Sequence, residues 1–170
     1  RHGGRAVSPA DDGYPRRLLD VRPPPPVVFL VGPWVHDGPV VAVVGAREAT
    51  EDGLDVAREL GFGLARSGAA VVSGLARGID AAAHEGALEA GGRSGAVLGT
   101  GIDRCYPRAN ASLQGRLARS LGLLSEILPG AAPTRSTFAS RNRLVAALSD
   151  VVVVVQGRAK SGSLLTAQEA

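Results

Sequence analysis

The chain has 170 residues, of which 45% are hydrophobic, and carries 19 basic against 16 acidic side chains. This length favours one domain with a sizeable core, and hydrophobic runs of about six residues are too short to span a bilayer. The single cysteine, Cys105, excludes an internal disulfide and a cysteine-based zinc site and fits a reducing cytosol.

The first 38 residues are expected to lead into the domain that follows them. Residues 1–25 are polar and rich in proline, which is typical of a linker. The apolar run from Val27 to Val31 indicates a short edge strand. We therefore expect a lead-in or linker over 1–38 and the main domain over 39–170, truncated at its C-terminus.

Beyond residue 38, apolar β-branched runs bounded by glycine alternate with helical periodicity. The expected strands are 40–45, 69–73, 94–98, 121–125 and 150–155. The expected helices are 49–67, 77–90, 111–120, 139–148 and one that begins near 163, with a loop over 129–137. All-apolar strands that alternate with helices predict a mostly parallel sheet covered by helices on both faces.

Small, polar and basic residues follow these strands, where parallel sheets bind ligands and helix N-termini favour anions. Arg47 can pair with a phosphate through its forked guanidinium, although Gly45-Ala46-Arg47 could equally be a structural turn. Ser73-Gly74 can donate through hydroxyl and backbone groups. Lys160 to Ser163 supply a cation, hydroxyls and helix N–H groups, without the spacing of a Walker A loop. The pattern predicts a ligand that carries phosphate.

Asp80 and His84 lie four residues apart on one expected helix, so they can touch. An acid–base pair and a structural hydrogen bond are both compatible with that spacing. No serine or cysteine lies at a nucleophile elbow, because G-x-S-x-G is absent.

Phe138 is flanked by arginines and hydrogen-bonding polar residues over 135–143. An aromatic ring with guanidinium groups is how single-stranded nucleic acid is held, since bases stack on the ring and cations take phosphates. Residues 101–170 hold 9 basic and 4 acidic side chains, whereas 40–100 hold 5 and 8. The alternatives are that Phe138 packs against its helix and that the arginines form a solvated basic face.

Together these motifs resemble those of the DprA/Smf family of DNA-processing proteins. The matching stretches occur in family order along residues 40–170. They are Val43 to Arg47, Val72 to Asp80 with His84, Gly101 to Pro107 with Asn110, Leu124 to Glu126, Phe138 with Arg141 to Arg143, and Ser161 to Leu164 with Thr166 and Ala167.

The resemblance implies an extended Rossmann-like three-layer α/β/α fold that binds single-stranded DNA in the cytoplasm. It implies a non-enzymatic recombination mediator, without cofactor or metal, that protects incoming DNA and loads the RecA recombinase during natural transformation. A homodimer is expected for the full-length protein. Carried over by position, the DNA-binding residues would be Arg47, Ser73, Gly74, Arg77, Arg135, Phe138, Arg141, Asn142, Arg143, Lys160, Ser161, Gly162 and Ser163.

Two other functions compete with this one. A nucleotide-processing enzyme of the phosphoribohydrolase-like Rossmann type would carry Pro-Gly-Gly-x-Gly-Thr and a catalytic glutamate, and that string is absent. A dinucleotide-dependent oxidoreductase would need G-x-G-x-x-G, which is also absent. It would also need an acidic residue at the end of strand 69–73 to hold a ribose, and none stands there.

Overall fold

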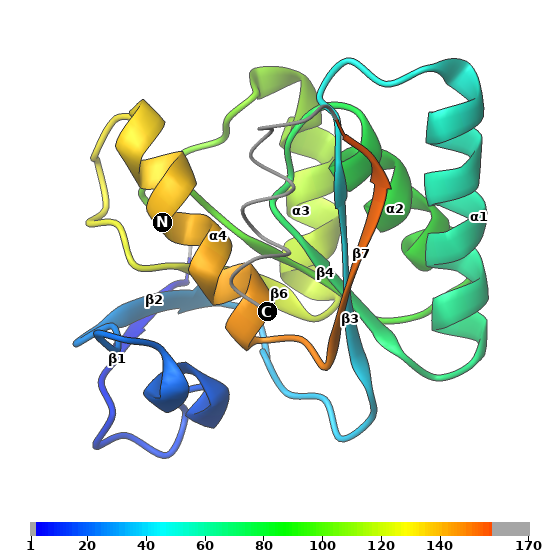
Figure 1. Cartoon of the computed structure of the whole chain (residues 1–170). Coiled ribbons are helices and arrows are strands. Elements are labelled where there is room, and N and C mark those ends of the chain that lie inside the picture. Colours follow the sequence, from blue (N-terminus) through cyan, green and yellow to red (C-terminus); the bar gives the residue numbers. More distant parts are fainter. Residues whose placement is uncertain (1–2, 158–170) are drawn as a thin grey trace.

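A computed structural model describes residues 3–157 as one α/β unit built on a seven-stranded sheet (Figure 1). The strands are β1 (Arg5–Val7), β2 (Val28–Val31), β3 (Val40–Gly45), β4 (Ala70–Ser73), β5 (Ser94–Val97), β6 (Gly122–Ser125) and β7 (Val151–Gln156). The α-helices are α1 (Glu51–Arg66), α2 (Ile79–Glu89), α3 (Ala111–Arg119) and α4 (Arg135–Ala147), and the 3-10 helices are η1 (Arg16–Asp20) and η2 (Arg108–Asn110). Within this part of the chain, no helix is both long and apolar enough to cross a bilayer.

The sheet has the strand order β1-β2-β6-β5-β4-β3-β7. Five neighbouring strands, β6 to β7 in that order, are parallel, and β2 pairs antiparallel with both β1 and β6. After β6 the chain crosses back through α4 to β7, on the far side of β3. The Rossmann-like fold with a mostly parallel sheet is thus confirmed.

Helices cover both faces of the sheet because consecutive strand residues point to opposite faces. In β3, Ala42 and Val44 pack with Leu144 of α4 in one core cluster. Val43, between them, packs with Ala57 of α1 in another. A third cluster joins α3 to β5 and β6. Figure 1 shows α4 on the face opposite to α1, α2 and α3.

The N-terminal segment differs from the expected linker because it folds onto the sheet. Tyr14, Leu18 and Val21 are buried in the same cluster as α4, and the Tyr14 hydroxyl donates to Pro25 O at 2.7 Å. β2 is also not the edge strand that was expected, because β1 pairs outside it. The three apolar anchors are spaced too sparsely among prolines and charges for sequence patterning to detect. The division of the chain after residue 38 stays a prediction.

The helix expected over 139–148 begins four residues earlier, at Arg135. Thr134 and Thr137 form a capping box: the Thr134 hydroxyl accepts from Thr137 N at 3.2 Å, and the Thr137 hydroxyl accepts from Thr134 N at 3.1 Å. This cap satisfies N–H groups that would otherwise lack partners. Phe138 consequently lies on the first turn of α4 rather than in a loop.

Candidate functional site

A pocket of about 680 Å³ opens beyond the carboxyl ends of the parallel strands. Four connections form its walls: those after β3, β4 and β5, and the one from β6 into α4. The lining residues are Arg47, Ala76, Arg77, Thr100, Arg104, Cys105, Tyr106, Pro107, Arg108, Ala109, Pro133 and Phe138. This is where ligands bind in open parallel sheets.

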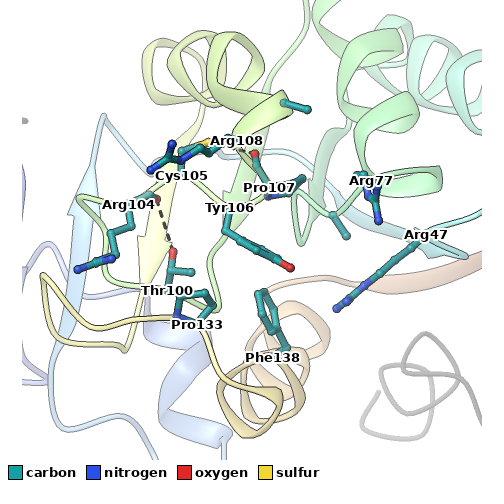
Figure 2. A pocket seen from close by; sticks show the side chains of 12 residues that line it. Arg47, Arg77, Thr100, Arg104, Cys105, Tyr106, Pro107, Arg108, Pro133 and Phe138 are labelled. Carbon is teal, nitrogen blue, oxygen red and sulfur yellow. Dashed lines mark hydrogen bonds between the residues drawn. The ribbon is translucent and has the colours of Figure 1, made fainter.

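The Phe138 ring lies close to both an arginine and a second aromatic ring. Arg47 Cζ is 5.2 Å from the Phe138 ring centroid, within cation–π range. The Tyr106 and Phe138 centroids are 5.5 Å apart with a 44° tilt. Figure 2 shows the two rings next to one another and Arg47 extending toward them. Tyr106 remains 49% exposed, so this pair offers aromatic surface to a ligand.

Phe138 can take this position because residue 99 is glycine. A Cβ at Gly99 would lie 2.6 Å from Phe138 Cδ1 and 3.0 Å from Cε1. Such distances are sub-van der Waals, so any side chain at 99 would push the ring out of place. The end of β5 and the start of α4 therefore fix the ring jointly.

The pocket is positively charged. Arg47, Arg77, Arg104 and Arg108 are all exposed, and among residues 3–157 no acidic residue lines the pocket. Cationic side chains around a hollow without nearby carboxylates attract anions and raise their local concentration.

The loop that carries Arg47 is fixed to the start of α2. Ile79 N donates to Ala46 O at 3.2 Å. The approach requires glycine at 78, whose φ is +78° and where a Cβ would lie 2.2 Å from Ala46 O. Arg47 and Arg77 are thereby held on adjacent, mutually braced loops.

Arg141, which was expected to contact DNA, is buried beneath the pocket and bonded to the backbone. Only 5% of it is exposed, and its Nη1 donates to Gly74 O at 2.7 Å and to Val97 O. Ser73 is likewise fully buried, with its hydroxyl donating to Val43 O at 2.6 Å. Gly74 N donates to Asp80 Oδ2 at 3.1 Å. The Ser73-Gly74 turn and Arg141 therefore support the pocket from beneath rather than line it.

Asp80 and His84 do not bond to each other. Asp80 Oδ2 accepts from Gly74 N and Ala76 N; burial raises its pKa, while the charge of Arg141 opposes that shift. His84 Nδ1 lies 2.8 Å from Ser94 Oγ. Because Ser94 Oγ donates to Val71 O, it accepts from Nδ1–H. Burial first, and the charge of Arg141 second, lower the pKa of His84 to about 3, so the imidazole is neutral. Asp80 and His84 therefore each make hydrogen bonds that stabilise the fold.

The other expected contact residues on α4 occupy different places. Arg135 is exposed on the first turn, three residues before Phe138 and so on the same helix face. Arg143 points away from the pocket: it forms a part-buried ion pair with Glu126 and donates to Pro23 O at 3.1 Å. Asn142 is half-buried and accepts from Arg141 Nε at 3.3 Å. Lys160, Ser161, Gly162 and Ser163 lie outside the described residues.

Sequence reasoning did not select nine of the twelve described residues that line the pocket, among them Arg104, Tyr106 and Arg108. A signal for these three was present, since two arginines and an aromatic residue fall within the five positions 104–108, which follow the strand at 94–98. The turn they form is held against the connection after β4, with Asn110 Nδ2 donating to Leu75 O at 3.0 Å. Among the described residues, no group of three or more histidine, cysteine or acidic side chains could hold a metal ion.

The fold and pocket place this protein in the class of Rossmann-like α/β proteins with a ligand site at the carboxyl edge of the sheet. The model of the family DNA recombination-mediator protein A matches residues 5–170. Protein Smf of Synechocystis sp. is 42% identical over 169 residues, covering 96% of this chain and 42% of the relative. DprA of Streptococcus pneumoniae is 40% identical over 161 residues, covering 94% and 57%. The chain belongs to the DNA recombination-mediator protein A family.

Solved structures agree with this assignment. The X-ray structure of DprA from S. pneumoniae superposes with a TM-score of 0.89 at 39% identity, covering 96% of this chain and 58% of that one. A structure of DprA from Helicobacter pylori superposes with a TM-score of 0.86 at 31% identity, covering 98% of this chain and 75% of that one. That structure is described as giving insight into a unique single-stranded DNA binding mode. The chain spans about half the length of the curated relatives.

Proposed function

We propose that this protein binds single-stranded DNA in the arginine-lined pocket without altering it chemically. In the full-length protein, we propose, this binding serves a cytoplasmic recombination mediator that protects incoming DNA and loads RecA during natural transformation. The Helicobacter pylori relative is described as binding single-stranded DNA, and the proposal extends that ligand to this chain.

The observation that carries the proposal is the Phe138 ring beside Tyr106 and Arg47. Bases of a single strand stack on aromatic side chains, while phosphates bind neighbouring cations. In a duplex, the base faces are already stacked on each other and cannot reach such rings. With one ring pair and four exposed arginines in the lining, phosphate contacts should dominate the affinity and sequence preference should be small.

Arg135 adds a second line of support. The first turn of α4 contains no acidic residue and begins with this arginine, although cations at a helix N-terminus oppose the helix dipole. A phosphate bound there would satisfy both the exposed guanidinium and the helix end. Arg135 therefore belongs with Arg47, Arg77, Arg104 and Arg108 in the proposed contact set, while Arg141 and Arg143 do not.

Binding without chemistry is supported by the composition of the pocket. Among the described residues, neither a carboxylate nor a histidine lines the pocket, and general acid–base catalysis needs such a group within hydrogen-bond reach of the reacting atoms. Burial raises the pKa of the Cys105 thiol, which disfavours the thiolate that a nucleophile requires. No observation favours the nucleotide-processing alternative over binding.

The test is fluorescence anisotropy of a labelled oligothymidylate and a duplex of equal length, across a salt series, for the parent chain, F138A and R47A. We expect the parent to prefer the single strand. F138A should weaken single-strand binding about 10-fold or more, because it removes stacking worth about 1–3 kcal/mol per base. R47A should lower the salt slope by about 0.7, the value for one phosphate contact on a single strand.

The matched control is R16A, which removes an exposed arginine of η1, on the α4 side of the sheet. Equal affinity of the parent, F138A and R47A would overturn the pocket assignment. Hydrolysis of nucleotides by the parent would favour the enzymatic alternative. For the mediator role, the full-length protein should accelerate RecA filament formation on single strands, and F138A should abolish that acceleration.

A further inference from the structure

A second cluster of arginines lies at the opposite end of α3 from the pocket. Residues 104–125 contain Arg104, Arg108, Arg116 and Arg119 and no acidic residue. All four arginines are exposed. Arg104 and Arg108 precede α3 and line the first pocket, whereas Arg116 and Arg119 lie on its last turn. The helix thus connects two basic regions through a stretch without negative charge.

The far end of α3 is hollowed. A pocket of about 650 Å³ there is lined by Pro33, Leu88, Gly91, Gly92, Arg93, Arg116, Arg119 and Ser120. Three of its eight lining residues are arginines and none is acidic. Within residues 3–157, no hydrogen bond or ion pair involves the side chains of Arg93, Arg116 or Arg119. We call this site the distal pocket.

The carboxylates nearest to the distal pocket are engaged elsewhere. Glu89 of α2 forms a two-pronged pair with Arg58 of α1, with Arg58 Nε at 2.9 Å from Oε2. Glu85 lies 3.7 Å from the same guanidinium. Arg58 is the first cause that lowers the pKa of Glu89, and Arg116 is only the last. Arg58 of α1 therefore holds both glutamates of α2, and its single positive charge offsets one of their two negative charges.

Helix-end electrostatics explains only part of this cluster. Arg116 and Arg119 are in the last turn of α3, where cations favour the helix dipole. Arg93 belongs to no helix and precedes β5, yet it lines the same hollow. Three like charges around one hollow repel each other, and a bound anion would offset that repulsion.

We infer that a DNA strand held in the first pocket continues along α3 and places its phosphates in the distal pocket. The inference rests on the proposed function. A nine-residue helix is about 14 Å long, which about four nucleotides span at 3.4 Å per stacked nucleotide. The distal pocket would thereby extend the site for longer single strands and supply sequence-independent phosphate contacts.

The experiment measures binding of labelled oligothymidylates of increasing length to the parent, to R116A/R119A, and to R16A/R22A as a charge-matched control on the α4 side of the sheet. We expect parent affinity to rise with length. R116A/R119A should bind the shortest oligonucleotide like the parent and the longest about 10-fold or more weakly, with a salt slope lower by about 1.4 for two lost contacts.

Three results separate the inference from the function on which it rests. No single-strand binding by the parent, or no effect of F138A, overturns both. Binding that depends on Phe138, with R116A/R119A equal to R16A/R22A at every length, overturns the distal pocket alone. An equal loss at all lengths also overturns it, because the arginines would then act only through overall charge. Thermal unfolding of each variant confirms that it is folded.

Discussion

The guanidinium of Arg141 occupies the space in which residue 74 would otherwise place a side chain. Arg141 Nη1 donates to Gly74 O at 2.7 Å, and a Cβ at Gly74 would lie 2.2 Å from Nη1 and 2.4 Å from Cζ. The arginine thus crosses beneath the pocket from α4 to the ends of β4 and β5. Asp80, which accepts from Gly74 N, supplies the opposite charge on the other side of the turn.

Gly74→Ala should destabilise the fold strongly. The new methyl group overlaps a guanidinium that is buried and hydrogen-bonded, so either the arginine or the turn must move. We expect the free energy of unfolding to fall by about 2–4 kcal/mol from overpacking and weakened charged hydrogen bonds. Urea denaturation monitored by circular dichroism measures this change.

The matched control is Gly63→Ala in the last turn of α1, where a Cβ would meet no atom within 4 Å. It should raise the free energy of unfolding by about 0.5–1 kcal/mol through helix propensity. Equal stabilities of the Gly74→Ala variant and the parent would contradict the role assigned to Arg141.

Arg141→Lys and Arg47→Ala should affect different properties. The lysine keeps a buried positive charge near Asp80 but lacks the forked donors, so stability should fall by about 1–3 kcal/mol. Arg47 is exposed, and its loss should change stability by about 0.5–1 kcal/mol at most while weakening single-strand binding. Parallel unfolding and anisotropy titrations separate these effects. An Arg141→Lys variant of parental stability that binds DNA poorly would return Arg141 to the contact set.

His84 should make the protein less stable in mild acid. Its pKa is about 3 in the folded protein and 6.5 ordinarily, so between these pH values the unfolded chain binds a proton that the folded protein excludes. The free energy of unfolding therefore rises with pH across this window, and His84 adds no further increase above it. The expected slope is about 1.4 kcal/mol per pH unit.

Urea unfolding of the parent and His84→Gln from pH 4.5 to 7.5 checks this dependence. Glutamine does not titrate, so the free energy of unfolding of the variant should rise less steeply with pH, by the contribution of one proton, whatever its overall stability. Identical pH dependences for the two proteins would mean that His84 binds protons equally in the folded and unfolded states, so that folding does not lower its pKa.

The strands of the parallel sheet could be predicted from sequence because each is a short apolar run closed by small residues. The position of the pocket could also be predicted in outline, because Arg47 follows β3 and Arg77 follows β4, and the carboxyl ends of these parallel strands share one edge of the sheet. The sequence could not distinguish which arginine of the 135–143 segment faces inward. Arg141 lies three residues after Phe138, on the same side of α4, yet it enters the core, where arginine is rare.

Tertiary contacts explain the other differences. Asp80 and His84 have the right spacing to meet on α2, but backbone N–H groups of the preceding turn and the Ser94 hydroxyl provide each with a different partner. Tyr14 and Leu18 anchor the N-terminal segment through contacts with distant strands, which no local periodicity reports.

Gly99→Ala offers a test of ring placement without any change in charge. A Cβ at residue 99 would lie 2.6 Å from Phe138 Cδ1, so the ring must leave its position beside Arg47 and Tyr106. We expect single-strand affinity to fall about as much as in Phe138→Ala, because stacking is lost in both. The salt slope should stay at the parental value, because every arginine remains.

Anisotropy across a salt series distinguishes this outcome from general damage, and Gly63→Ala serves as control. Gly63 lies in the last turn of α1, where a Cβ would meet no atom within 4 Å. That variant should bind DNA like the parent. If Gly99→Ala also binds like the parent, the ring position in the pocket does not determine affinity, and phosphate contacts alone carry the binding.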